Sequence, residues 1–225
     1  MSTKFQKEQN SLKMDATGKS KPISVVTVTL NSGKTLDRCI RSVISNKEFV
    51  HQHIIVDGGS SDNTLDIVNN YQKEQFRTEG GVEVIVLHQK GKGIYNAMNL
   101  GVLQCDSSSF VGILNSDDEY VEESLSIINQ HLENDDELIH GICEIIHESG
   151  EIEHHGLHHS FLPYKSIYHP TVFISKETYE RFGLYDEKIS LAADYDYFLR
   201  LYRSNVKMKY LPEVISRFYT GGASY

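Results

Sequence analysis

The sequence predicts an α/β fold whose main sheet is Rossmann-like and mostly parallel, followed by a mixed C-terminal half. Two observations support this fold class. Between residues 22 and 120, apolar β-branched runs alternate with segments whose apolar residues recur at helical spacing, which is typical of a doubly wound sheet. Beyond residue 121 the pattern changes to a hairpin, short strands and further helices. We therefore expect a single domain at residues 22–225, made of the halves 22–120 and 121–225.

The first half is expected to alternate strands with helices. Apolar and β-branched runs predict strands at residues 23–30, 54–57, 82–87 and 110–114. Apolar residues three and four positions apart predict helices at residues 36–44, 62–71 and 94–102. Because a helix lies between each pair of strands, we expect the strands to run parallel and to bind ligands at their carboxyl ends.

The second half is expected to mix strand directions. A helix is predicted at residues 121–132, and the polar segment 148–151 is expected to join two strands into a hairpin, at residues 138–147 and 152–157. The remaining elements are a strand at 171–174, a helix at 175–182 ended by Gly183, a helix at 191–202, and two last strands at 207–211 and 214–219.

The composition is that of an ordinary globular protein and argues against several classes of partner. The chain is 39% hydrophobic and 24% charged, and its net charge of −9 disfavours a nucleic-acid surface. No apolar run is long enough to cross a bilayer, so we expect a cytoplasmic protein with at most peripheral membrane association. Residues 1–21 predict a disordered basic tail. Cys39, Cys105 and Cys143 are far apart and are expected to be free thiols in the core.

Polar residues follow three of the predicted strands, at positions 29–31, 57–62 and 115–118. Because parallel strands end at the same edge of a sheet, these segments are expected to form one pocket. Asp117 and Asp118 are adjacent carboxylates, which suit a divalent cation that also binds phosphate oxygens, although residues 115–118 also suit a turn or a helix N-cap. The sequence has no G-x-G-x-x-G after the first strand and no P-loop motif, which disfavours dinucleotide binding and P-loop chemistry.

Five ordered motifs resemble those of the family 2 glycosyltransferases of GT-A fold, above all the bacterial members that build O-antigen, capsule or exopolysaccharide. The motifs are ISVVTVTLN (residues 23–31), VDGGSSDNT (56–64), KGIYNAMNLG (92–101), LNSDD (114–118) and AADYD (192–196). The resemblance implies an inverting transfer of one sugar from a nucleotide-diphosphate sugar, with UDP as the expected nucleotide. The implied acceptor is a hydroxyl of a saccharide, with a lipid-linked saccharide at the inner face of the cytoplasmic membrane as the expected class.

The resemblance also implies roles for individual residues. Asp194 matches the general base of the family, and Asp117, with Asp118 beside it, matches the ligand of Mn²⁺ or Mg²⁺. Asp57 matches the residue that holds the nucleoside base. The full set implied to contact the nucleotide sugar is Thr29, Asn31, Asp57, Lys92, Gly93, Asn99, Asn115, Ser116 and His169.

The sequence departs from the family pattern at three positions. Asn115 stands where the D-x-D motif has its first Asp, Ala193 where many relatives have Glu, and Gly58 where many have a second Asp. The change at position 115 removes a charge and leaves metal binding mainly to Asp117. Two alternatives therefore stay open: a non-catalytic module that binds a nucleotide sugar or a partner transferase, and a sugar nucleotidyltransferase, for which residues 31–34 are a poor glycine-rich loop.

Several candidate residues also have a structural interpretation. Asp194, near the start of a predicted helix, could interact with the helix dipole, as could Asp196. His169 could be a buried, hydrogen-bonded histidine. Residues 154–159 hold four histidines that could bind zinc, but their acidic neighbours and hairpin setting favour a surface loop. Residues 221–224 predict either a flap over the donor or a frayed end.

Overall fold

The computed structural model describes residues 21–133 and 135–221. In this part of the chain, nine strands form one sheet in the order β3-β2-β1-β4-β8-β6-β9-β5, with β7 paired to β6. The strands are β1 (Ile23–Thr29), β2 (Val50–Asp57), β3 (Glu83–His88), β4 (Phe110–Ile113), β5 (Glu119–Tyr120), β6 (Leu138–Ile146), β7 (Ile152–His155), β8 (Phe173–Ser175) and β9 (Met208–Tyr219). The α-helices are α1 (Leu36–Ser45), α2 (Thr64–Arg77), α3 (Ile94–Gln104), α4 (Ser124–His131), α5 (Lys176–Phe182) and α6 (Ala193–Arg203), and the 3-10 helices are η1 (Lys47–Phe49), η2 (His159–Phe161) and η3 (His169–Thr171).

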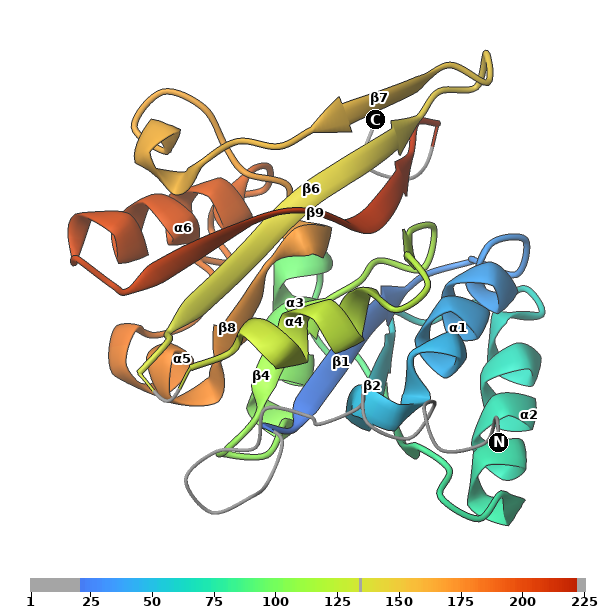
Figure 1. The fold of residues 1–225 in the computed structure, drawn as a ribbon. Helices are drawn as coiled ribbons and strands as arrows, with labels where there is room; N and C mark the ends of the chain where they lie inside the picture. Colours follow the sequence, from blue (N-terminus) through green and yellow to red (C-terminus); the bar gives the residue numbers. More distant parts are fainter. Residues whose placement is uncertain (1–20, 134, 222–225) are drawn as a thin grey trace, which may run out of the picture.

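The alternating half forms the predicted parallel sheet with helices on both faces (Figure 1). β1 lies between β2 and β4, β3 extends the sheet beyond β2, and all three pairings are parallel. Val26 and Ile54 pack in one core cluster with residues of α3, whereas Val25 and Ile55 pack on the other side with residues of α1 and α2. Because both faces are covered, these strands have continuous apolar sequences instead of alternating ones.

The C-terminal half continues the same sheet with mixed strand directions, as predicted. β8 is antiparallel to β4, β6 is antiparallel to both β8 and β7, and β9 is parallel to β6. The prediction of two last strands was wrong, because residues 208–219 form the single strand β9. Its register against β6 jumps from His140↔Tyr210 to Ile142↔Val214. The intervening residues, which include Pro212, are therefore accommodated as a bulge-like irregularity instead of a turn.

The prediction of a helix over residues 121–132 with an acidic start was also wrong in part. Glu119 and Tyr120 form the short strand β5, which pairs with Arg217 and Ser216 of β9. The helix α4 begins only at Ser124, after a residue with a left-handed backbone. Pairing with β9 thus outweighs the helix-start pattern, and it brings the end of β9 next to residues 115–118.

Close packing between α3 and β1 positions the start of α3 at the carboxyl edge of the sheet. Gly101 of α3 faces Val26 of β1, and a Cβ atom at Gly101 would lie 2.3 Å from the Cγ1 atom of Val26. No real Cβ approaches a neighbouring atom so closely, so glycine is required for this distance between helix and sheet. The first turn of α3 consequently lies beside the loops that follow β1 and β2.

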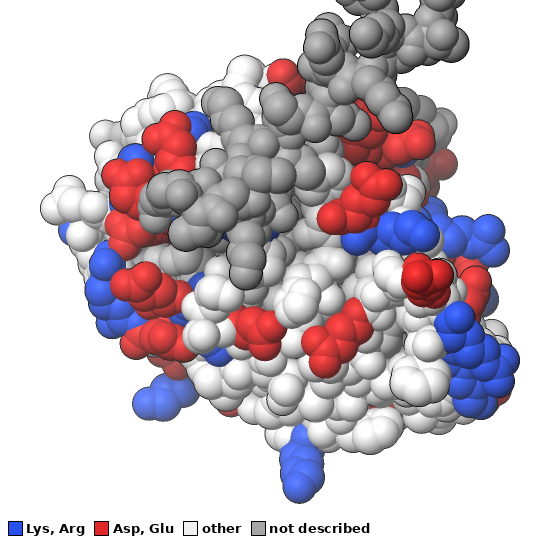
Figure 2. All heavy atoms as spheres, turned by 60° about the horizontal axis from the view of Figure 1, so that its bottom comes forward, with Lys and Arg blue, Asp and Glu red and all other residues white. Residues whose placement is uncertain are grey.

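The remaining predictions concern the cysteines, membrane-spanning helices, the charged surface and the two ends of the chain. Cys39, Cys105 and Cys143 are buried free thiols, as predicted. None of the helices in the described ranges is both long and apolar enough to span a bilayer. Acidic and basic side chains are interspersed on the face of the molecule in Figure 2. Apart from Lys21 and Gly221, the predicted tail and the predicted flap lie outside the described residues.

Candidate functional site

A large cavity lies at the carboxyl edge of the parallel strands. Its volume is about 1060 Å³, at the upper end of the range of roughly 300–1,000 Å³ that is usual for small-molecule sites. The sequence-predicted site residues that line it are Thr29, Asn31, Gly93, Asn115, Ser116, Asp117, His169 and Asp194. The two carboxylates on which the sequence interpretation depends most, Asp117 and Asp194, therefore share one cavity although they lie far apart in the chain.

The loops after β1 and β2 are joined to each other by hydrogen bonds. The backbone N–H of Asn31 donates to the Ser60 hydroxyl at 2.8 Å, and the Asn31 side-chain oxygen accepts from the backbone N–H of Ser61 at 2.9 Å. Asn31 adopts a left-handed backbone with φ of 51°, which asparagine tolerates better than most residues. These contacts close one end of the cavity.

Asp57 is placed differently from what the family resemblance implies. Its side chain is 1% exposed and does not line the cavity. Its carboxylate instead accepts hydrogen bonds from the backbone N–H groups of Gly59 and Ser60. The neighbouring residue Gly58 does line the cavity. In this structure Asp57 shapes the loop, and the surface that faces the cavity at this point is that of Gly58.

The segment 115–118 enters the cavity by extending the pairing of β4 with β1. The backbone N–H of Leu114 donates to the carbonyl of Val26, and that of Ser116 to the carbonyl of Val28. The Ser116 hydroxyl is 2.7 Å from the Ser32 hydroxyl. Asn115 keeps a buried side-chain oxygen for which no hydrogen-bond partner is found among the described residues. An acceptor is therefore present where the D-x-D motif would have a carboxylate.

Asp118 does not lie with Asp117 on the cavity wall. Its side chain is fully buried, and only Asp117 lines the cavity. Burial raises the pKa of Asp118 well above its usual value, and the charge of Asp117 raises it further. The structure thus does not bring the Asp118 carboxylate to the position of a second metal ligand.

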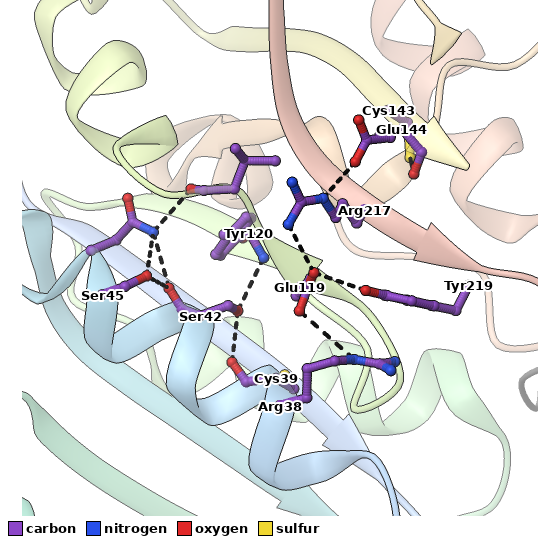
Figure 3. A network of polar contacts seen from close by, with 12 residues as sticks. Arg38, Cys39, Ser42, Ser45, Glu119, Tyr120, Cys143, Glu144, Arg217 and Tyr219 are labelled. Atoms are coloured by element: carbon purple, nitrogen blue, oxygen red, sulfur yellow. Dashed lines mark hydrogen bonds and ion pairs between the residues drawn. The ribbon is translucent and has the colours of Figure 1, made fainter. Parts of the chain in front are cut away.

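A set of ion pairs and hydrogen bonds that was not predicted from the sequence joins Arg38, Glu119, Arg217 and Tyr219 (Figure 3). The Arg38 guanidinium donates to the backbone carbonyl of Asp117 at 2.6 Å and lies 3.6 Å from the ring centroid of Tyr219. Glu119 approaches Arg38 at 3.8 Å, pairs with Arg217 at 3.2 Å and accepts from the Tyr219 hydroxyl at 2.9 Å. One sequence signal could have identified Arg38, because a cation in the first turn of a helix opposes the helix dipole.

The other end of the cavity is formed around Asp194 in the first turn of α6. One carboxylate oxygen, Oδ1, accepts from the Tyr95 hydroxyl at 3.2 Å, and the other, Oδ2, is 3.6 Å from Nδ1 of His169. Burial lowers the pKa of His169, while the charges of Asp194 and Asp117 act to raise it. The Nε2 atom of His169 is buried, with no hydrogen-bond partner among the described residues. Sequence analysis did not single out Tyr95 for any role.

Two more predicted residues are not brought to the cavity. Lys92 is exposed and does not line it, whereas Lys34 and Lys165 do. The side-chain amide of Asn99 is used structurally, because it donates to the carbonyl of Tyr185 at 2.9 Å and accepts from the N–H of the same residue at 3.0 Å. Asn99 therefore connects α3 to the segment before α6 instead of contacting a ligand.

The histidines near residues 154–159 do not form a metal-binding group in the described chain. Within the described residues, the group of acidic, histidine or cysteine side chains that is compact enough to hold an ion consists of Glu133, Asp135 and Asp136. Those carboxylates form ion pairs with Lys207 and Lys209. The predicted surface loop was wrong in part, because His154 and His155 belong to β7 and His159 begins η2, 3.3 Å from the buried His140.

Comparison with known proteins decides the family. The model of the family described as Glycosyl transferase family 2 matches residues 24–206. The chain belongs to this family. One relative of this family 2 chain is a PGL/p-HBAD biosynthesis glycosyltransferase of Mycobacterium bovis, 26% identical over 202 residues that cover 87% of this chain and 72% of the relative. Another is a GalNAc(5)-diNAcBac-PP-undecaprenol beta-1,3-glucosyltransferase of Campylobacter jejuni, 32% identical over 58% of this chain and 40% of the relative.

Solved structures have the same fold. TarS 1–349 of S. aureus in complex with UDP-GlcNAc superposes with a TM-score of 0.71 at 17% identity, over 90% of this chain and 59% of that one. GalNAc-T7 with UDP, GalNAc and Mn²⁺ gives a TM-score of 0.67 at 15% identity, over 92% of this chain and 45% of that one. This family 2 chain therefore has the predicted GT-A fold. It spans 59% of the TarS 1–349 chain and 45% of the GalNAc-T7 chain.

Proposed function

We propose that the protein transfers one sugar, with inversion, from a nucleotide-diphosphate sugar to a hydroxyl of a saccharide acceptor. The observation that carries the proposal is that Asp117 and Asp194 line the same cavity, at the carboxyl edge of a parallel sheet. A reaction of this kind requires one group to hold the departing diphosphate and another to accept the proton of the attacking hydroxyl. Asp117 and Asp194 stand on different elements, so one carboxylate can act on the diphosphate while the other acts on the hydroxyl.

The residues around Asp117 fit a divalent cation, Mn²⁺ or Mg²⁺. A hard cation of this type needs only one or two protein carboxylates when phosphate oxygens and water complete its coordination. Asp117 supplies one carboxylate on the cavity wall, and the unpaired buried oxygen of Asn115 lies two residues away. A bound cation would supply charge neutralisation for the diphosphate. The neighbouring structure with UDP and Mn²⁺ supports this expectation at the level of the fold.

The chain's own residues would bind the donor and move the proton. Thr29, Asn31 and Gly58 would contact the nucleoside, with the Asp57 carboxylate holding the loop of Gly58 in shape. Lys34 and Lys165 would add positive charge near the diphosphate, since they line the cavity and Lys92 does not. Asp194 would accept the hydroxyl proton, a role typically worth about 10²–10⁴ in rate.

Two finer points of the proposal concern the donor and the acceptor. UDP is the proposed nucleotide, which is supported by the neighbouring structures with UDP-GlcNAc and with UDP. A lipid-linked saccharide of a bacterial surface polysaccharide, reached from the cytoplasmic side of the membrane, is the proposed acceptor class. The C. jejuni relative, whose name specifies an undecaprenol-linked acceptor, supports this class.

The alternatives make different predictions. In a nucleotidyltransferase, residues 31–34 would need to wrap a triphosphate, but the backbone N–H of Gly33 donates to the Asp62 carboxylate at 3.0 Å, so part of this loop is already engaged. In a non-catalytic module, the nucleotide sugar would bind without turnover. The presence of Asp194 in the donor cavity favours the enzyme over the module.

A thermal-shift panel of UDP, GDP, ADP and CDP, each with and without Mn²⁺, tests the proposal, because a ligand that binds only the folded state raises its stability. We expect UDP with Mn²⁺ to raise the Tm most, and UDP-sugar then to be converted to UDP with an acceptor mixture or slowly with water. Equal and metal-independent shifts for all four nucleotides, or binding with no turnover, would contradict the proposed reaction.

A further inference from the structure

The start of α6 lacks the side chain that normally closes a helix N-terminus. Its N-cap residue is Ala192, whose side chain can accept no hydrogen bond and whose φ of 64° is left-handed. Ser, Thr, Asp or Asn usually satisfies the first free N–H groups from this position. A non-glycine residue in this conformation costs about 1 kcal/mol or more and persists only where surrounding contacts hold it. Contacts from another element must therefore stabilise the turn that carries Asp194.

Tyr95, in the first turn of α3, supplies such contacts. Its hydroxyl donates to Oδ1 of Asp194 at 3.2 Å. Its side chain is only 9% exposed, and its ring lies 6.0 Å from that of Tyr185. Burial, with the charge of Asp194 as the next cause, raises the pKa of Tyr95 to about 12. The phenol therefore keeps its proton at physiological pH and stays a donor.

We propose that Tyr95 is a positioning residue for the reaction, whose hydroxyl holds the turn that carries Asp194 and fixes the orientation of the Asp194 carboxylate. The inference rests on the proposed function, since it assigns Tyr95 a role through the base. A carboxylate on an open helix turn can rotate about two side-chain bonds. A donor fixed on Oδ1 removes this freedom and leaves Oδ2 in a set direction, next to His169.

The titratable groups that face Asp194 come from several elements. Tyr95 belongs to α3, His169 to η3 and Tyr185 to the segment before α6, and Asp117 faces His169 across the cavity. Lowering of the His169 pKa by burial favours its neutral form. A neutral imidazole can donate from Nδ1 in only one tautomer, whereas the Tyr95 phenol always carries its proton. The Tyr95 hydroxyl is consequently the constant donor to the Asp194 carboxylate.

Tyr95→Phe tests the inference, because it removes the hydroxyl and keeps the ring. Loss of this hydrogen-bond donor leaves the Asp194 carboxylate free to rotate. We therefore expect kcat to fall about 10-fold, since a misplaced base loses rate. The KM for the donor and the Mn²⁺-dependent shift with UDP should change less than about twofold, because Tyr95 acts on the base and not on Asp117.

Tyr185→Phe is the matched control. This variant removes a buried hydroxyl that bonds the Tyr179 hydroxyl at 3.0 Å and packs against Tyr95 without a hydrogen bond to Asp194. It should lower the Tm and leave kcat within about twofold of the wild type. An unchanged kcat in Tyr95→Phe, or an equal loss of kcat in Tyr185→Phe, would overturn the positioning role.

A second readout separates this inference from the proposed function. In the intact protein labelled with ¹³C at aspartate carboxyls, the Asp194 resonance should differ in chemical shift between Tyr95→Phe and the wild type at one fixed pH, because Oδ1 loses a hydrogen bond, whether or not a substrate is known. An unchanged resonance would count against Tyr95 even if transfer were observed. Absence of any turnover, with the resonance shifted as expected, would instead reject the proposed reaction alone.

Discussion

The guanidinium of Arg38 donates a 2.6 Å hydrogen bond to the backbone carbonyl of Asp117. The same group stacks on Tyr219 and approaches Glu119, so α1, β5 and the end of β9 all bear on the segment that carries the proposed metal ligand (Figure 3). This arrangement connects the two halves of the chain at the site. It implies that the position of Asp117 depends on residues that contact no substrate.

Replacement of Arg38 by lysine should therefore weaken the site without unfolding the protein. Lysine keeps the charge but has no planar group to stack on Tyr219 while bonding the Asp117 carbonyl. We expect transfer to fall about 10- to 100-fold, with a smaller Mn²⁺-dependent shift with UDP, because a small displacement of a binding group has effects of this size. Arg41→Lys, one turn further along α1, is the control, since Arg41 is exposed and pairs only with Asp37. Equal effects of the two substitutions would remove the assigned role of Arg38.

Replacing Asp117 or Asp118 by asparagine should have different effects on the binding of the metal. Asp117→Asn should abolish the Mn²⁺-dependent part of the thermal shift with UDP, because it removes the carboxylate on the cavity wall. Asp118→Asn should retain that shift, because the Asp118 side chain is buried away from the cavity. The measurement is the Tm with UDP, with and without Mn²⁺, for both variants. Loss of the metal response in Asp118→Asn would restore the sequence-based assignment of Asp118 as a ligand.

Buried histidines should make stability fall as the pH is lowered. Burial lowers the pKa of His53 to about 3, below the ordinary value of 6.5. Between these values the unfolded chain binds a proton that the folded chain does not, so stability decreases as pH falls, by up to about 1.4 kcal/mol per pH unit for this group. His53→Gln should reduce the slope of the unfolding free energy between pH 6.5 and about 4 by this amount. An unchanged slope in His53→Gln would contradict the burial argument.

The sequence predicted the fold best where one local signal and the tertiary structure agree. The alternation of apolar runs with helical spacing located β1 to β4 and the helices between them, because helices on both faces bury the central strands β1 and β4 completely. It failed where pairing with a distant strand decided the outcome. Glu119 and Tyr120 pair with residues of β9 that lie almost a hundred positions later in the chain, and a local pattern contains no information about that partner.

In the candidate site, too, local patterns predicted the position of the site but not the contacts of its side chains. Strand ends identified Thr29, Asn31, Asn115 and Asp117, because the carboxyl edge of a parallel sheet is predictable once the strands are known. The direction of individual side chains was not predictable. Asp118 and Asn99 are turned into the protein, and the roles of Tyr95 and Arg38 depend on contacts across long sequence separations.

The central claim is that Asp194 accepts the proton of the acceptor hydroxyl while Asp117, in the same cavity, holds the donor. The most direct test is to measure, on the same Asp194→Asn protein, both the release of UDP from a UDP-sugar in an acceptor mixture and the Kd for UDP with Mn²⁺. The account predicts that the Kd changes less than about twofold while the release rate falls by about 10²–10⁴. Full activity in this variant, or loss of UDP binding equal to the loss of rate, would contradict it.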